Sequence, residues 1–202
     1  MGLGQMPSKE IYFSIDIETD GQAPGLSSIL PLGCAAFLPT SDEPIGTWQR
    51  NYTPLPDAES DAETLLWWRG FPDVWSQLQK DRILPALATA EFAEWIKTIA
   101  GDNKAIAAAW PASWDWAFVY YYFRRFNVRS TFGHSALDIK TLWVAYTIRK
   151  WGRSWASGRT YKADVPQEWK GASQHTHIGV DDAVEQGKIL IHLLRELRND
   201  KT

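Results

Sequence analysis

Cysteine is almost absent from this chain of 202 residues, in which Cys34 is the only one. A single cysteine excludes an internal disulfide and a zinc site built from several thiolates, so a reducing compartment is the natural setting. Long hydrophobic runs are also missing. Residues 22–41 carry no charge, but their prolines and small polar residues make a poor membrane-spanning helix. Residues 1–6 lack the features of a secretory signal, so we expect a soluble cytoplasmic protein that does not contact membranes.

A cationic surplus is missing too, because 21 Lys and Arg residues face 24 Asp and Glu residues and the net charge is −3. Proteins that hold duplex nucleic acid non-specifically usually carry a large positive excess, so this class is disfavoured. Hydrophobic residues make up 45% of the chain, which excludes disorder over most of it and supplies a substantial core. The 12 tryptophans are ambiguous, because tryptophan packs cores and also stacks on bases and sugars.

Strand patterns come first along the chain, and helical patterns follow. Residues rich in β-branched and aromatic side chains predict strands at 11–17, 29–38 and 47–52, and three strands in succession favour an antiparallel meander. The apolar run 104–110 fits a buried parallel strand. Helices are predicted at 61–69, 72–80, 85–100, 115–126, 138–151 and 181–198. The expected fold class is α/β, a mixed sheet with helices on both faces.

No repeat or linker marks a second domain, so residues 1–202 are expected to form a single domain. Residues 152–174 are rich in Ser, Gly, Lys and Trp and are interpreted as an insertion or long loop. Such a segment inside a compact domain is usually functional or mobile.

Two carboxylates stand at strand spacing in the first predicted strand. Because alternate residues of a strand share a face, Asp16 and Glu18 are expected to project together. Neighbouring carboxylates raise each other's pKa unless a cation compensates. The alternative is a half-exposed strand that ends in solvent. In a buried central strand, carboxylates without a partner are energetically costly, so their presence there favours a functional site.

Two later segments carry further candidate residues. Asp115 follows the predicted buried strand, where ligand sites gather in α/β sheets, although capping a helix is the alternative role. His177 precedes Asp182 by five positions, a spacing that can aim both side chains into one cleft. Asp181 is the better helix cap, which leaves Asp182 for other work. A solvated loop histidine remains the alternative for His177.

In this order, the three segments resemble the motifs of the DEDDh 3′–5′ exonucleases, a branch of the ribonuclease H-like superfamily. The segments are 16–21 (Asp-Ile-Glu-Thr-Asp-Gly), 113–118 (Ser-Trp-Asp-Trp-Ala-Phe) and 177–183 (His-Ile-Gly-Val-Asp-Asp-Ala). The resemblance spans residues 11–197 and is greatest to a bacterial and phage exoribonuclease-like branch that carries Thr-Leu-Leu-Trp-Trp, here residues 64–68. It implies a ribonuclease H-like fold and a metal-dependent hydrolase.

The resemblance also implies a role for each motif residue in a reaction that uses two Mg²⁺ or Mn²⁺ ions. Asp16 would bridge the ions, Glu18 and Asp182 would complete the first, and Asp115 would hold the second. His177 would act as general base toward the attacking water. The reaction would hydrolyse phosphodiester bonds from the 3′ end of single-stranded RNA or DNA and release nucleoside 5′-monophosphates.

Substrate-binding residues are expected in two segments. The resemblance places the 3′-terminal nucleotide near the backbone of Thr19, Asp20 and Gly21. Residues 149–170 interleave cations with aromatic rings, which is the chemistry of single-strand binding, unless the rings fold back on the core. The cations expected to grip phosphates are Arg153, Arg159 and Lys162.

Two other functions stay open from the sequence. One keeps the fold but acts as an endonuclease or nucleotide hydrolase, and the other is a non-catalytic, tryptophan-rich module that binds single strands. The tryptophans at 67, 68 and 75 are interpreted as core or dimer contacts, so a homodimer is a further expectation.

Overall fold

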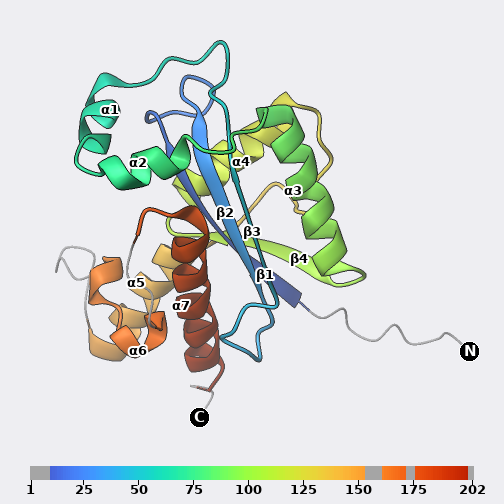
Figure 1. Ribbon diagram of the computed structural model, residues 1–202. Helices are drawn as coiled ribbons and strands as arrows, with labels where there is room; N and C mark the ends of the chain where they lie inside the picture. The colour runs from blue at the N-terminus through green and yellow to red at the C-terminus, as the bar shows by residue number, and fades with distance from the viewer. Residues whose placement is uncertain (1–9, 153–160, 172–175, 200–202) are drawn as a thin grey trace, which may run out of the picture.

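The centre of the structure, a computed structural model, is a five-stranded sheet in the order β3-β2-β1-β4-β5 (Figure 1). The described residues are 10–152, 161–171 and 176–199. The strands are β1 (Glu10–Thr19), β2 (Ile29–Phe37), β3 (Gly46–Asn51), β4 (Lys104–Ala109) and β5 (Leu137–Asp138). β1, β2 and β3 pair antiparallel in succession, whereas β4 joins β1 in parallel and β5 joins β4 in parallel. The predicted mixed sheet is confirmed.

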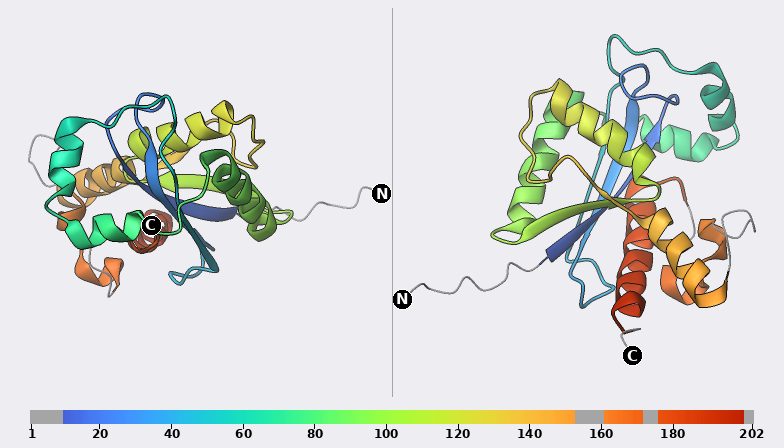
Figure 2. Two further views of the ribbon diagram at one scale, coloured as in Figure 1. Left: turned by 45° about the horizontal axis from the view of Figure 1, so that its top comes forward. Right: turned by 180° about the vertical axis from the view of Figure 1, so that it is seen from behind.

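Helices cover both faces of the sheet, as predicted (Figure 2). They are α1 (Ala62–Trp68), α2 (Pro72–Leu78), α3 (Pro85–Ala100), α4 (Ala112–Arg125), α5 (Ile139–Trp151), α6 (Gln167–Lys170) and α7 (Gly179–Asn199), with the 3-10 turn η2 (Lys162–Asp164). Helices α3 and α4 pack on one face, and α5 and α7 pack on the other. Because helices cover both faces, β1 and β2 are buried over almost their whole length.

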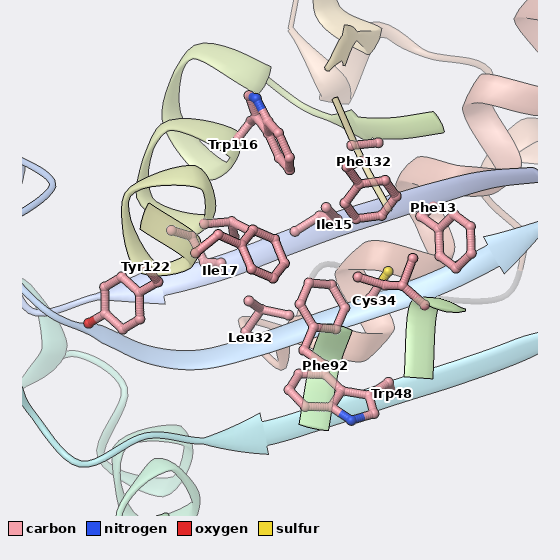
Figure 3. Packing of buried hydrophobic residues seen from close by; sticks show 14 of the residues in the cluster. Phe13, Ile15, Ile17, Leu32, Cys34, Trp48, Phe92, Trp116, Tyr122 and Phe132 are labelled. Atoms are coloured by element: carbon pink, nitrogen blue, oxygen red, sulfur yellow. The ribbon is translucent and has the colours of Figure 1, made fainter. Parts of the chain in front are cut away.

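β1 supplies a different set of side chains to each face. Phe13, Ile15 and Ile17 point into the α3–α4 side, where Figure 3 shows them among Phe92 and Trp116. The alternate positions face α7, because side chains alternate along a strand. This alternation therefore directs Asp16 and Glu18 toward α7.

Helix α7 lies directly on β2 because two glycines meet where the helix begins. A Cβ atom on Gly33 would lie 2.0 Å from the carbonyl carbon of Gly179, so a larger side chain is excluded there. Gly33 is also the partner of Asp16 in the β1–β2 register. The contact therefore brings the first turn of α7 beside Asp16.

Helices α1 and α2 form a separate unit beside the end of β1 (Figure 1). Asp61 caps α1 by accepting a hydrogen bond from the Thr64 N–H at 2.8 Å. The indole Nε1 of Trp68 donates to the carbonyl of Thr19 at 3.0 Å, and Trp68 packs with Leu30 in a small third core. This hydrogen bond ties the unit to the strand that carries Asp16 and Glu18.

Several boundaries differ from the predicted ones. Helix α4 begins at Ala112, three residues before its predicted start, so Asp115 lies in its first turn. Helix α7 begins at Gly179, so Asp181 also lies in the first turn and the prediction that it is the cap was wrong. The described part of the predicted insertion, residues 161–171, forms η2 and α6. Within the described ranges, every helix is too short or too polar to span a bilayer.

Candidate active site

The first two acids project from the end of β1, on the side toward α7. Asp16 is 7% exposed, and Glu18 is half-buried two residues further along. Oε1 of Glu18 lies 3.1 Å from Nδ1 of His177, which stands two residues before the start of α7. One oxygen or nitrogen atom from each of Glu18, His177 and Asp182 lies within 4.8 Å of the others, a grouping that could hold a metal ion.

Backbone hydrogen bonds fix the segment that carries His177 and Asp182. The Val180 N–H donates to Oε1 of Gln49, on β3, at 2.9 Å. The Thr176 N–H donates to Oδ1 of Asp182 at 3.2 Å. His177 has a φ of 56°, a left-handed conformation that few non-glycine residues adopt but that histidine adopts more readily than most. The chain thus turns sharply at His177, and the imidazole lies against Glu18.

Asp115 approaches the acids of β1 from α4, which packs on the other face of the sheet. It is 3% exposed, and its Oδ1 accepts a hydrogen bond from the Ile17 N–H at 3.1 Å. Pro111 occupies the N-cap position of α4, so Asp115 is not the helix cap. Asp115 instead contacts β1 at Ile17, the residue between Asp16 and Glu18.

Burial raises the pKa of Asp16 well above its ordinary value, and three nearby carboxylates raise it further. These carboxylates belong to Asp115, Glu18 and Asp182. Burial likewise raises the pKa of Asp115, to about 8. Oδ2 of Asp16 has no hydrogen-bond partner among the described residues. Such a concentration of buried carboxylates favours cation binding.

The donor set fits a hard divalent cation. Carboxylate oxygens are the ligands that Mg²⁺ and Mn²⁺ prefer, whereas a site for zinc would be expected to contain more imidazole or thiolate. The hydrogen bond that the Glu18 carboxylate accepts from the imidazole raises the pKa of His177 in the absence of a cation. A cation held by Glu18 would compete with this contact.

The predicted substrate-binding residues fall into three groups. The Asp20 N–H donates to the carbonyl of Ser28, and the Asp20 carboxylate accepts from the Ser28 N–H and the Ser60 hydroxyl. Asp20 therefore holds the turn together, which argues against its amide as a substrate contact. Thr19 Oγ1 donates to the carbonyl of Gly21 at 2.7 Å within the same turn. Arg153 and Arg159 lie outside the described residues.

Lys162 is the predicted cation that the structure places near the acids. It begins η2, and its positive charge lowers the pKa values of Asp16 and Asp115. The segment 161–171 therefore approaches the carboxylates from the side of the predicted insertion.

An aromatic wall flanks His177. The ring centroids of Trp67 and Phe71 lie 5.0 Å and 4.8 Å from that of the imidazole. Trp68 is buried in the core as expected, but Trp67 is 45% exposed and borders the site. Trp67 is therefore not a core residue, and the alternative prediction that it forms a dimer contact stays a prediction. Sequence spacing does not tell which face of α1 meets the turn before α7.

A comparison with protein families decides the assignment. A family model described as the 3′-5′ exoribonuclease Rv2179c-like domain matches residues 12–194. The chain belongs to this family. The 3′-5′ DNA exonuclease Cap18 of Escherichia coli is 30% identical to this Rv2179c-like chain over 195 residues, 96% of each. The Rv2179c-like chain is therefore a 3′–5′ exonuclease, a hydrolase that acts on nucleic acid.

Solved structures confirm the fold of the Rv2179c-like chain. The nuclease domain of 3′hExo, a DEDDh family member bound to rAMP, has a TM-score of 0.67 and 11% identity, with 93% of both chains covered. Exonuclease I has a TM-score of 0.68 and 14% identity, and the match covers 96% of this chain but 44% of that one. The resemblance to DEDDh nucleases with a ribonuclease H-like sheet is confirmed.

The metal-free Rv2179c-like protein is expected to lose stability as the pH rises from about 5 to about 8. Because burial raises the pKa of Asp115 to about 8, the folded state keeps a proton that the unfolded chain releases near its ordinary, lower pKa. The folded protein then binds more protons than the unfolded chain, so the unfolding free energy falls with pH. Thermal unfolding over this pH range, after EDTA treatment, measures the slope of stability against pH.

Asp115→Asn should flatten that slope, because the variant has no proton to release at this position. The contribution of one such group is at most about 1.4 kcal/mol per pH unit. A slope that is unchanged in Asp115→Asn would show that the Asp115 carboxyl is ionised in the folded protein.

Proposed function

We propose that the chain is a metal-dependent exonuclease that removes nucleoside 5′-monophosphates from the 3′ end of single-stranded nucleic acid by a two-metal mechanism. The observation that supports this proposal is the convergence of acids from three elements: β1, α4 and α7. These acids are Asp16, Glu18, Asp115 and Asp182. A binding module has no need to bury carboxylates against one another, because their mutual repulsion costs stability.

Each acid has a role in this proposal. Asp16 would contact both cations, Glu18 and Asp182 would hold one, and Asp115 would hold the other. When bound, the two ions would activate the attacking water and stabilise charge on the leaving oxygen. Asp16 and Asp115 are buried, and β1 and α4 hold their side chains in place, so a reacting phosphate would meet groups of fixed geometry.

His177 is the proposed general base, because it is the imidazole beside the acids. His177→Ala is expected to lower kcat by about 10²- to 10⁴-fold, the usual value of a positioned base. Mn²⁺ affinity should change little, since the carboxylates provide the ligands. Single-turnover cleavage measures the first effect, and calorimetry measures the second. The control is His134→Ala, at an exposed position in the segment before β5, which should leave both unchanged. Full activity in His177→Ala would remove this residue from the mechanism.

The preference for single strands is supported by the wall beside His177. Trp67 presents a partly exposed ring close to the reacting groups, and an aromatic ring there can stack on a base that is not already paired and stacked. Phe71 and Trp68 pack behind Trp67, which holds its ring in place. A terminal nucleotide entering this site would therefore separate from its complement.

Lys162 is the proposed phosphate contact of this site, since its charge already acts on the acids. Lys162→Gln should raise KM and reduce the slope of log affinity against log salt by about 0.7, the value for one phosphate contact on a single strand. Binding is measured without a divalent cation over a range of NaCl concentrations. Lys104→Gln, at the opposite end of β1 and β4, is the control and should change neither quantity. An unchanged slope in Lys162→Gln would refute the contact.

The experiment that tests the function uses end-labelled RNA and DNA of identical sequence, single- and double-stranded, with Mg²⁺, Mn²⁺ or EDTA. Stepwise loss of mononucleotides from the 3′ end, only with a metal, is the expected result. Internal cuts would show an endonuclease, and binding without cleavage would show a binding module. The RNA and DNA arms matter because the family description names an exoribonuclease, whereas Cap18 is a DNA exonuclease. The homodimer, the cytoplasmic location and the single domain stay predictions.

A further inference from the structure

Gln186 is a buried residue of α7 that contacts Asp16 directly. It is 1% exposed, and its Nε2 donates a hydrogen bond to Oδ1 of Asp16 at 2.5 Å. It lies four residues after Asp182, so both side chains extend from the same face of α7. One helix therefore presents an acid of the site together with a donor for the acid on the opposing strand.

The chemistry of an amide suits this position. A carboxylate only accepts hydrogen bonds, so the amide nitrogen must face Asp16 when Asp16 is ionised. The amide orients Oδ1 without adding a positive charge, and Oδ2 keeps no partner among the described residues. A lysine or arginine here would neutralise Asp16 and compete with a cation. An apolar residue would leave the carboxylate free to rotate.

The second polar atom of the Gln186 amide indicates that the residue does not serve stability. Its Oε1 is buried and has no hydrogen-bond partner among the described residues. A buried polar atom without a partner lowers the stability of the folded state, and natural proteins tolerate this mainly at functional sites. Gln186 therefore lowers the stability of the folded protein, which favours a functional role for it.

We propose that Gln186 is a positioning residue that orients Asp16 for binding divalent cations. This inference rests on the proposed metal-dependent function, because it assigns Gln186 a role toward the same cations. Groups that orient metal ligands typically change metal affinity or activity by about 10- to 100-fold when they are removed. Gln186 acts through Asp16 and has no contact of its own with the substrate in this proposal.

The test is Gln186→Met, which keeps the length and nearly the volume of the side chain but removes the donor. Mn²⁺ binding is measured by calorimetry on the full chain without nucleic acid, and the melting temperature is measured in EDTA. We expect Mn²⁺ affinity to fall by about 10- to 100-fold while the metal-free melting temperature stays the same or rises. The cleavage rate should recover in part at high Mn²⁺ concentration.

Two further variants separate positioning from packing. Ile189→Val removes a methylene from another buried position of α7, and should lower the melting temperature without changing Mn²⁺ affinity. Gln186→Leu provides a second variant without the donor, in case the methionine packs poorly, and should also bind Mn²⁺ more weakly.

The outcomes distinguish this inference from the function on which it rests. If the unaltered chain binds Mn²⁺ and Asp16→Asn does not, the metal site is established. Equal Mn²⁺ affinity in Gln186→Met and the unaltered chain would then overturn the role of Gln186 alone. If the unaltered chain binds no Mn²⁺, both the metal mechanism and this inference fail.

Discussion

Asp16→Asn should lower the exonuclease rate by roughly 10³-fold or more, which corresponds to the several kcal/mol of charge stabilisation that metal ions supply. Asp16 is the acid on which the effects of the other three converge, so its loss should affect both proposed cation positions. Asparagine keeps the shape of the side chain, and its Oδ1 can still accept a hydrogen bond from Gln186. Mn²⁺ binding should disappear along with activity.

The same substitution should raise the melting temperature of the metal-free protein above pH 7. Burial and neighbouring charges raise the pKa of Asp16, which means that its ionised form is unfavourable in the fold. Asparagine removes this repulsion, a trade of activity for stability that is common at functional sites. Asp102→Asn, at an exposed turn after α3, is the control and should change neither property. An inactive Asp16→Asn that melts at a lower temperature would contradict the electrostatic account.

Gly33→Ala should cause the largest loss of stability among single-methyl additions to the sheet. The new Cβ would lie 2.0 Å from the carbonyl carbon of Gly179 and 2.2 Å from the Val180 nitrogen, so backbone must move. Overpacking of a core usually costs about 1–3 kcal/mol, and a clash with backbone belongs at the upper end of this range. Urea unfolding measures this loss.

Activity should fall further in Gly33→Ala than the loss of stability explains. The displaced segment is the first turn of α7, which carries Asp182 and lies next to His177. Cleavage is therefore measured at low temperature, where the variant is folded. The matched control is Gly133→Ala, whose Cβ would meet nothing within 4 Å and which should remain active and stable. A fully active Gly33→Ala would show that α7 tolerates displacement from the sheet.

The sheet was predictable because its signals are local. β-branched and aromatic residues at 11–17, 29–38 and 47–52 identify three strands whose sequence order gives the meander, and the apolar run at 104–110 identifies the parallel strand. Strand β5 has two residues and is too short to leave a pattern. The start of α4 was misplaced because Pro111 caps it without a side-chain hydrogen bond, so the usual polar signal is missing.

The candidate site was predictable to the extent that its residues belong to motifs. Asp16, Glu18, Asp115, His177 and Asp182 lie in segments whose order and spacing are informative, and the structure brings them together. Trp67 and Gln186 depend on which helix faces meet after folding, and one sequence does not contain that information. Gln186 did carry a signal, since it follows Asp182 by one helical turn, but glutamine at that spacing is common on ordinary helices.

The indole of Trp68 joins α1 directly to the strand that carries Asp16 and Glu18. Its hydrogen bond to Thr19 anchors α1 to the end of β1, and the ring of Trp67 packs on Trp68 and beside His177. In the proposed function, the end of β1 would therefore position both the stacked base and the hydrolysed bond. A nucleotide that rests on that ring would present its phosphate at one depth, whatever its base, which suits an enzyme that repeats the same cut along a strand of mixed sequence.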